Sequence, residues 1–247
     1  MNTFPQNLDE VVKQAKAATK SAIADGYQRI QVELVVAEIA LKAQLLAIEF
    51  AEMFEEYGTG VKVMFPDTGA AMLARRDWGD KPFQVTDMGS RFTDIETQVS
   101  PEDKLFIVVA PSAVEVGRAE KLCNLAGDRP VVFLIPQLED VSVVGIGYAA
   151  RQIRERFIST IHTSYYFRLL DGAAILRCYP AKWQVWLETE TGYELATELN
   201  NKPIGEDLEL LLTKLTSSQP DGDKASTKPK KSGILSNLQS FLKALSQ

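Results

Sequence analysis

The side chains that could carry out catalysis are few. His162 is the only histidine, and the two cysteines, Cys123 and Cys178, lie in different predicted elements. A Ser-His-Asp or Cys-His site would have to include His162, which follows a predicted helix and has neither cysteine near it in sequence. A histidine at the surface or at a helix end is therefore the favoured interpretation, and we expect no catalytic residue.

The same residues argue against a metal centre. One histidine and two cysteines cannot supply the four nitrogen or sulfur ligands of a structural zinc site. We expect no metal and no cofactor. Two cysteines also cannot form a disulfide framework, which favours a reducing compartment.

A turn at Asp67-Thr68-Gly69 could bind an anion. It follows a predicted buried strand and begins a helix. Loops at the carboxyl ends of parallel strands bind ligands in such sheets, and free amides at a helix start can hold an anion. The Asp67 carboxylate would repel a phosphate, however, and Asp is among the best helix caps. A ligand site and a simple cap both fit, and the cap is favoured.

A second candidate loop contains Gly145 and Gly147 before another predicted helix. It lacks the third glycine of a dinucleotide-binding loop. Four arginines could contact an anion or a partner near these two loops: Arg75, Arg76, Arg151 and Arg154. A solvated helix surface explains the same arginines and is the favoured interpretation.

The elements that must position these residues alternate between strands and helices. Apolar runs predict strands at 30–36, 61–65, 105–110 and 131–135. Helical spacing predicts helices at 8–23, 39–57, 70–77, 111–126 and 145–161. Residues 79–103 are polar and irregular, apart from 83–85. The alternation indicates an α/β fold with a mainly parallel, Rossmann-like sheet and helices on both faces.

After residue 162 the pattern changes to an antiparallel meander, which we expect to extend the sheet edge. Its strands are predicted at 165–170, 174–179, 183–188 and 193–198, before a helix at 204–215. Trp183 and Trp186 should lie on opposite faces because side chains alternate along a strand. Both faces then need cover, most simply by the protein's own helices.

The C-terminal segment differs from the body. We interpret residues 1–216 as a single α/β domain, 217–232 as a disordered linker and 233–247 as an amphipathic helix. The apolar side chains of that helix fall within about 120° of arc. They are Ile234, Leu235, Leu238, Phe241, Leu242 and Leu245, and Lys230 and Lys231 precede them.

This tethered helix suits docking to an anionic membrane surface or into a partner's groove. It could equally pack back onto the domain. Residues 218–247 carry a net charge of +3 and residues 1–217 carry −9, and the acidic body argues against nucleic-acid binding. Without a signal-type or membrane-spanning apolar run, we expect the cytosol or a membrane surface facing it.

Several segments together carry a family resemblance. They are Phe65-Pro66-Asp67-Thr68-Gly69, Ala74-Arg75-Arg76-Asp77-Trp78, Ala110-Pro111, Arg129-Pro130-Val131-Val132, Gly145-Ile146-Gly147-Tyr148-Ala149-Ala150-Arg151, Tyr179-Pro180-Ala181-Lys182-Trp183-Gln184-Val185-Trp186 and Lys202-Pro203. Over roughly residues 5–215 the chain resembles a family of cyanobacterial and chloroplast proteins classified only as a domain of unknown function. It departs at Ile135-Pro136, where the family pattern would have Asn-Pro.

The resemblance implies a photosynthetic, thylakoid-associated role. Plant members include an assembly factor named for low photosystem II accumulation and the C-terminal extension of a chloroplast adenylate kinase. We therefore expect a non-catalytic assembly or scaffold factor for photosystem II biogenesis. Its partner would be a photosystem II subunit, an assembly intermediate or the membrane. The alternative is a phosphate- or nucleotide-binding protein or enzyme that uses the Asp67 and Gly145 loops.

Overall fold

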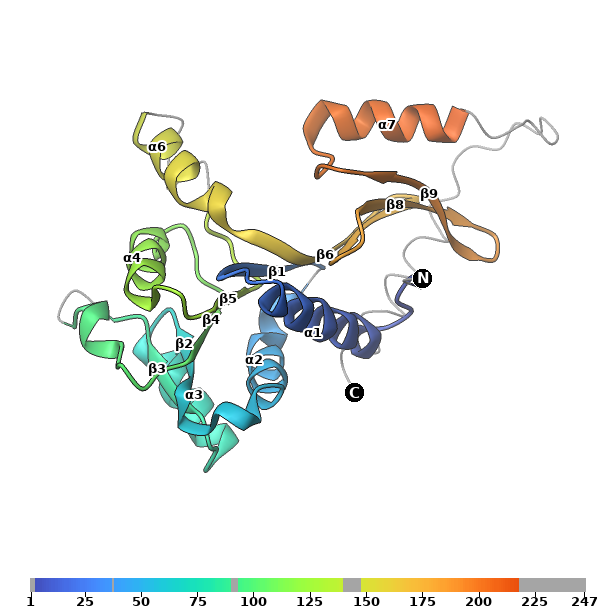
Figure 1. Cartoon of the computed structure of the whole chain (residues 1–247). Coiled ribbons are helices and arrows are strands. Elements are labelled where there is room, and N and C mark those ends of the chain that lie inside the picture. The colour runs from blue at the N-terminus through green and yellow to red at the C-terminus, as the bar shows by residue number, and fades with distance from the viewer. Residues whose placement is uncertain (1–2, 37, 90–92, 140–147, 218–247) are drawn as a thin grey trace.

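The computed structural model describes residues 3–36, 38–89, 93–139 and 148–217. Within them nine strands form one sheet in the order β3-β2-β4-β5-β1-β6-β7-β8-β9 (Figure 1). The predicted linker and C-terminal helix, and the apolar and basic residues assigned to them, lie outside the described residues from position 218 onward.

The first six strands of the sheet pair in parallel. They are β1 (Arg29–Val35), β2 (Val61–Phe65), β3 (Gln84–Asp87), β4 (Leu105–Val109), β5 (Val131–Leu134) and β6 (His162–Leu170). The mainly parallel α/β sheet predicted from the sequence is confirmed. Among these strands only β3 was missed, because it is a short edge strand with no buried residue and a single apolar side chain, Val85.

Helices cover both faces of the sheet, as predicted. On one face α1 (Leu8–Ala24), α2 (Ala43–Glu52) and α3 (Thr68–Trp78) share a core with inward side chains of the strands. On the other, α4 (Val116–Ala126) and α6 (Tyr148–Arg156) pack over β2, β4 and β5. The last helix, α7 (Gly205–Ser217), packs on this second face against the meander.

Three predicted helices are shorter than their sequence patterns. Residues 39–57 divide into a 3₁₀ turn, α2 and a second 3₁₀ segment. Ser112 and Glu115 form the expected capping contact, with Ser112 N donating to the Glu115 carboxylate at 2.9 Å, but α4 begins only at Val116. The helix predicted to end at Ile161 is α6 followed by a 3₁₀ turn, so His162 starts β6 instead of ending a helix.

The antiparallel meander consists of β6, β7 (Ala173–Cys178), β8 (Trp183–Thr189) and β9 (Gly192–Leu199). Trp183 packs in a small cluster with Leu208 of α7, whereas Trp186 joins the core beneath α1. The two tryptophans therefore lie on opposite faces, and the protein's own elements cover both, as predicted.

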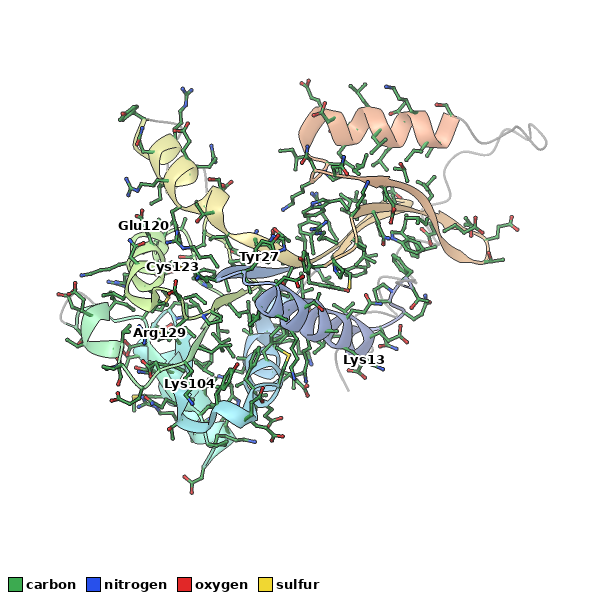
Figure 2. All side chains as sticks on the ribbon, in the orientation of Figure 1. Lys13, Tyr27, Lys104, Glu120, Cys123 and Arg129 are labelled. Carbon is green, nitrogen blue, oxygen red and sulfur yellow. The ribbon has the colours of Figure 1, made fainter. Side chains whose placement is uncertain are left out.

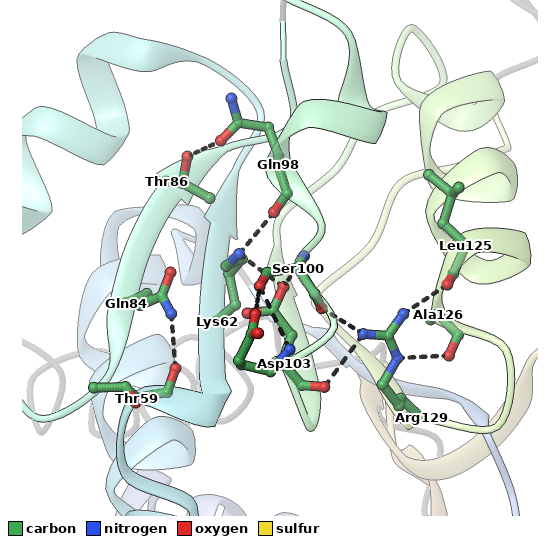
Figure 3. Close-up of polar contacts among 11 residues, drawn as sticks. Thr59, Lys62, Gln84, Thr86, Gln98, Ser100, Asp103, Leu125, Ala126 and Arg129 are labelled. Atoms are coloured by element: carbon green, nitrogen blue, oxygen red, sulfur yellow. Dashed lines mark hydrogen bonds and ion pairs between the residues drawn. The ribbon is translucent and has the colours of Figure 1, made fainter.

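A buried polar network fixes the amino ends of β2, β4 and β5 (Figure 3). The Lys62 ammonium lies 2.7 Å from the Asp103 carboxylate, and both side chains are almost fully buried. The Arg129 guanidinium donates to four backbone carbonyls, those of Ser100, Asp103, Leu125 and Ala126. These contacts tie the loop before β4 to the end of α4.

In the part of the chain that the structure describes, no helix combines the length and apolar character needed to cross a membrane.

Candidate functional site

The sheet has a topological switch point between β1 and β5. These strands are neighbours, yet the chain proceeds from β1 toward β2 on one side and from β5 to β6 on the other. In open α/β sheets, the loops that leave such a pair diverge to opposite faces and leave a crevice at the carboxyl ends of the strands. This position is the first place to look for a binding site.

A crevice of about 550 Å³ opens there. The carboxyl ends of β1, β4 and β5 and the start of the first 3₁₀ turn line it. The lining residues are Glu33, Leu34, Val35, Val36, Ile39, Ala40, Ala110, Ile135, Pro136 and Gln137. We call this pocket the switch-point crevice.

Three backbone positions bordering the switch-point crevice are strained. Glu38, Ala110 and Ile135 have φ angles of 61°, 47° and 45°, and no other non-glycine residue in the described ranges has a positive φ. For L-residues this conformation costs roughly 1–2 kcal/mol, and for a β-branched side chain it is a clear outlier. Such strain concentrates at functional sites.

The chemistry of the switch-point crevice is mainly apolar. Glu33 is the only charged residue among those that line it. The Glu33 carboxylate accepts from the Lys202 ammonium at 2.9 Å, and no lining residue carries a positive charge. An apolar side chain would fit this surface, whereas a phosphate would lie against a carboxylate and aliphatic side chains.

The crevice continues onto an unusual polar side of β1. Residues of β1 alternate between buried and half-exposed, and Arg29, Gln31 and Glu33 occupy the exposed side. Central strands of parallel sheets are normally apolar on both faces. Here Gln31 Nε2 donates to the Glu33 carboxylate at 2.8 Å and to Thr163 Oγ1 at 2.9 Å, so the polar groups bond to one another.

We call Arg29, Gln31 and Glu33 the polar strip, and two separate apolar clusters flank it. Gln31 is in register with Phe133 of the cluster under α4 and α6, and Glu33 with Tyr166 of the cluster under α7. Figure 1 shows α6 and α7 standing apart on this side of the sheet. Lys202 lies between the polar strip and the cluster under α7, with its ammonium 4.2 Å from the centroid of the Tyr166 ring.

The polar groups of the Asp67 turn form hydrogen bonds with neighbouring residues of the protein. Asp67 Oδ1 accepts from Ala70 N at 2.9 Å and thereby caps α3. Thr68 Oγ1 donates to Asp87 Oδ2 at 2.8 Å, and Gly69 lies in the first turn of the helix. None of the three lines the switch-point crevice.

The candidate arginines do not form one group. Arg75 and Arg76 lie in the last turn of α3, roughly 12 Å along the helix from Asp67. Arg75 Nε donates to the Val85 carbonyl at 2.8 Å, and Arg76 pairs with Asp77.

The other two arginines lie on α6, on the opposite face of the sheet from α3. Arg154 pairs with Glu139 at 3.1 Å, while Arg151 is exposed and forms no ion pair within the described ranges. Gly145 and Gly147 lie outside those ranges.

The environments of Cys123 and His162 do not activate either side chain for catalysis. Burial raises the pKa of the Cys123 thiol to about 12, so this side chain stays protonated at neutral pH. Burial and the nearby Arg177 lower the pKa of His162, whose Nε2 has no hydrogen-bond partner among the described residues. In the same part of the chain, no three His, Cys, Asp or Glu side chains group closely enough to hold a metal ion.

A family model identifies the domain to which this architecture belongs. The model for DUF1995, a domain of unknown function, matches residues 5–210. The chain belongs to the DUF1995 family. The match begins just before α1 and ends within α7, so the DUF1995 domain contains all nine strands, the switch-point crevice and the polar strip.

Sequence reasoning missed the crevice of this DUF1995 domain. Its lining comes from the ends of three strands, and most of those residues are ordinary aliphatic side chains. One signal was present: Arg29, Gln31 and Glu33 alternate with Ile30, Val32 and Leu34, which marks a polar face on a strand that the topology makes central.

Proposed function

We propose that this DUF1995 protein is a non-catalytic assembly factor for a photosynthetic complex. Photosystem II biogenesis at the cytosolic surface of the thylakoid is the process that the family resemblance favours. In this role the protein would hold an incompletely assembled partner and release it unchanged. The switch-point crevice is the binding site that we assign to the partner.

The strained backbone around the switch-point crevice carries the proposal. Three L-residues hold positive φ where the ends of β1, β4 and β5 meet. Strain of this size persists where surrounding packing enforces a particular surface shape. A preshaped, largely apolar surface at the switch point of an α/β sheet is suited to binding.

The lining chemistry favours a protein segment over a nucleotide. Leu34, Val36 and Ile39 offer apolar contacts, and Glu33 and Gln137 offer polar groups at the rim. An extended segment with one or two apolar side chains would bury them here and be oriented by the rim. A nucleotide would need free cations for its phosphates, and the lining residues provide none.

A pull-down from photosynthetic membranes tests the proposal. The full-length chain is compared with Ala40→Arg, which places a bulky charge in the crevice at an exposed position. The matched control is Ala17→Arg, which makes the same change on the exposed side of α1. A third variant lacks residues 218–247, which separates membrane retention by the tail from partner binding by the domain.

We expect photosystem II subunits to be recovered with the full-length chain and with Ala17→Arg, and to be lost with Ala40→Arg. Loss of membrane retention alone on removal of the tail would assign the tail to the membrane. Equal recovery with both arginine variants would exclude the crevice as the binding site. Absence of any photosynthetic subunit from the full-length sample would overturn the assembly role.

A further inference from the structure

A second pocket lies at the opposite end of β1 from the switch-point crevice. It has a volume of about 500 Å³ and lies where β1 and β6 begin, beside the ends of β7 and β9. Its main lining groups are Tyr27, His162, Thr163, Arg177, Trp183 and Asn201. We call it the Arg177 pocket. It takes no part in the assembly role proposed above.

The Arg177 guanidinium is a half-buried charge without a counter-ion. No carboxylate in the described part of the chain forms an ion pair with it. The guanidinium lies instead against the aromatic rings of Tyr179 and Trp183, whose centroids are 5.8 and 5.9 Å from its carbon atom. Partly buried cations are normally paired, because desolvation of an isolated charge is costly. The body of this protein is acidic, so leaving an arginine unpaired here is all the more unusual.

Neutral hydrogen-bond donors surround the same space. Thr163 Oγ1 accepts from Gln31 Nε2, which leaves the Thr163 hydroxyl proton free to donate elsewhere. The Asn201 side chain is exposed and lines the pocket. Another lining residue, Thr160, accepts from the Arg29 guanidinium at 3.0 Å, so a second arginine without an ion pair in the described ranges stands next to the pocket.

Aromatic rings make the remaining sides rigid. Tyr27 stacks on His162 with centroids 3.7 Å apart, and Tyr179 meets the edge of His162 at 4.9 Å. Figure 2 shows Tyr27 next to the start of β1, at the border of the two halves of the sheet. Flat walls, one strong cation and several neutral donors form a site for a small oxyanion, because charge-assisted hydrogen bonds to arginine are strong in partly dry surroundings.

We propose that the Arg177 pocket binds a small anionic ligand through a carboxylate or phosphate group held by Arg177, with Thr163 and Asn201 donating to the same oxyanion. A bound anion would neutralise Arg177 and satisfy the hydroxyl and amide donors at once. This ligand would lie at the amino-terminal ends of β1 and β6, at the opposite end of β1 from the switch-point crevice.

The single histidine provides the readout. His162 gives one set of imidazole signals in an NMR spectrum of the full-length chain, and it lines the pocket. The probes are sodium sulfate, which mimics a phosphate dianion without titrating near neutral pH, and sodium acetate. Sodium chloride at matched ionic strength corrects for screening. We expect saturable shifts of the His162 signals and, with sulfate, a rise in the His162 pKa.

Variants locate the binding group. Arg177→Gln should weaken anion binding about tenfold or more, since it removes a charged hydrogen bond. Arg177→Lys should retain part of the affinity, and it remains informative if the glutamine variant fails to fold. The control Arg118→Gln removes a half-exposed arginine of α4 outside the pocket and should leave the affinity unchanged. Each variant is compared with its own anion-free titration.

Saturation by sulfate alone would identify a phosphate- or sulfate-type ligand, and by acetate alone a carboxylate. Saturation by both would identify the shared oxyanion chemistry. Shifts that match those in chloride for both probes would overturn the proposal, as would equal affinity of the wild type and Arg177→Gln.

Discussion

The ring of Tyr27 stacks on the imidazole of His162, and 3.7 Å separates the two ring centroids. The stack covers one face of the only histidine of the chain, and the charge of the nearby Arg177 guanidinium lowers the pKa of that histidine. Tyr179 closes the edge of the same imidazole and donates its hydroxyl proton to Asp25 at 2.7 Å. A histidine so enclosed has a protonation equilibrium that reports directly on its surroundings.

The first prediction concerns the pKa of His162. Burial is the larger cause of its lowered pKa and the Arg177 charge is the second. Arg177→Gln should therefore raise the His162 pKa toward the ordinary value without restoring it fully, because burial remains. Titration of the His162 signals by NMR measures this change. A pKa that is unaltered in Arg177→Gln would show that the two side chains do not interact.

The second prediction follows by linkage. The His162 pKa is lower in the folded chain than in the unfolded chain, so the unfolded chain binds a proton first as the pH falls. The contribution of His162 to stability is thus complete above its ordinary pKa near 6.5 and declines as the pH drops through the folded-state pKa.

Urea unfolding between pH 7.5 and 5 measures this effect as the difference between the wild type and His162→Gln. The difference isolates His162 from the carboxylates that titrate at lower pH. The wild type should lose more stability than the variant across this interval. Parallel curves for the two proteins would contradict the linkage argument.

The third prediction concerns the buried Lys62–Asp103 pair. Asp103→Asn leaves the Lys62 ammonium buried without its counter-charge, so the free energy of unfolding should fall by about 3 kcal/mol. Glu96→Gln, which breaks the exposed pair with Lys121, is the matched control and should have a far smaller effect. Urea denaturation compares both with the wild type. A double variant, Lys62→Met with Asp103→Leu, should recover much of the loss, because no buried charge then remains.

The sequence predicts an element well when the residues that determine it are close together in the chain. The alternation of apolar runs located β1, β2, β4 and β5 and the meander, since each strand carries its own periodicity. β3 escaped because Gln84–Asp87 has no buried residue, and its strand state depends on pairing with β2. The division of residues 39–57 into three short helical segments likewise depends on packing and not on the apolar spacing.

The two pockets depend on contacts between distant residues. Tyr27, His162, Arg177 and Asn201 become neighbours only once the order of the strands is known. The sequence did place Asp67 correctly as a residue at the start of a helix, because a cap is a contact within three residues. The bond from Arg75 to the Val85 carbonyl depends on the packing of α3 beside β3, whereas Arg76 pairs with Asp77, its neighbour in sequence.

The fourth prediction concerns the two cysteines. Burial raises the pKa of Cys123 to about 12, and Cys178 is buried as well. Figure 2 shows Cys123 on α4 close to Glu120; the Arg29 charge lowers the pKa of the thiol and the Glu120 charge raises it, and burial outweighs both. Because the thiolate is the reactive form, neither cysteine should react with iodoacetamide at pH 8 while the chain is folded. Both should react in urea, as mass spectrometry would record. Rapid labelling of Cys123 in the native chain would contradict its burial.

The last prediction tests the strain at the switch-point crevice. Ala110 has a φ of 47°, a conformation that glycine adopts without steric cost. Ala110→Gly should raise the free energy of unfolding by about 0.5 kcal/mol, because relief of strain exceeds the added freedom of the unfolded chain. The matched control is Ala17→Gly on the exposed side of α1, which should lower it by about 1 kcal/mol. Urea denaturation measures both, and an equal loss in the two variants would show that Ala110 is unstrained. If Ala110→Gly is more stable but recovers less partner from membranes, the strain serves to keep the crevice in its binding shape.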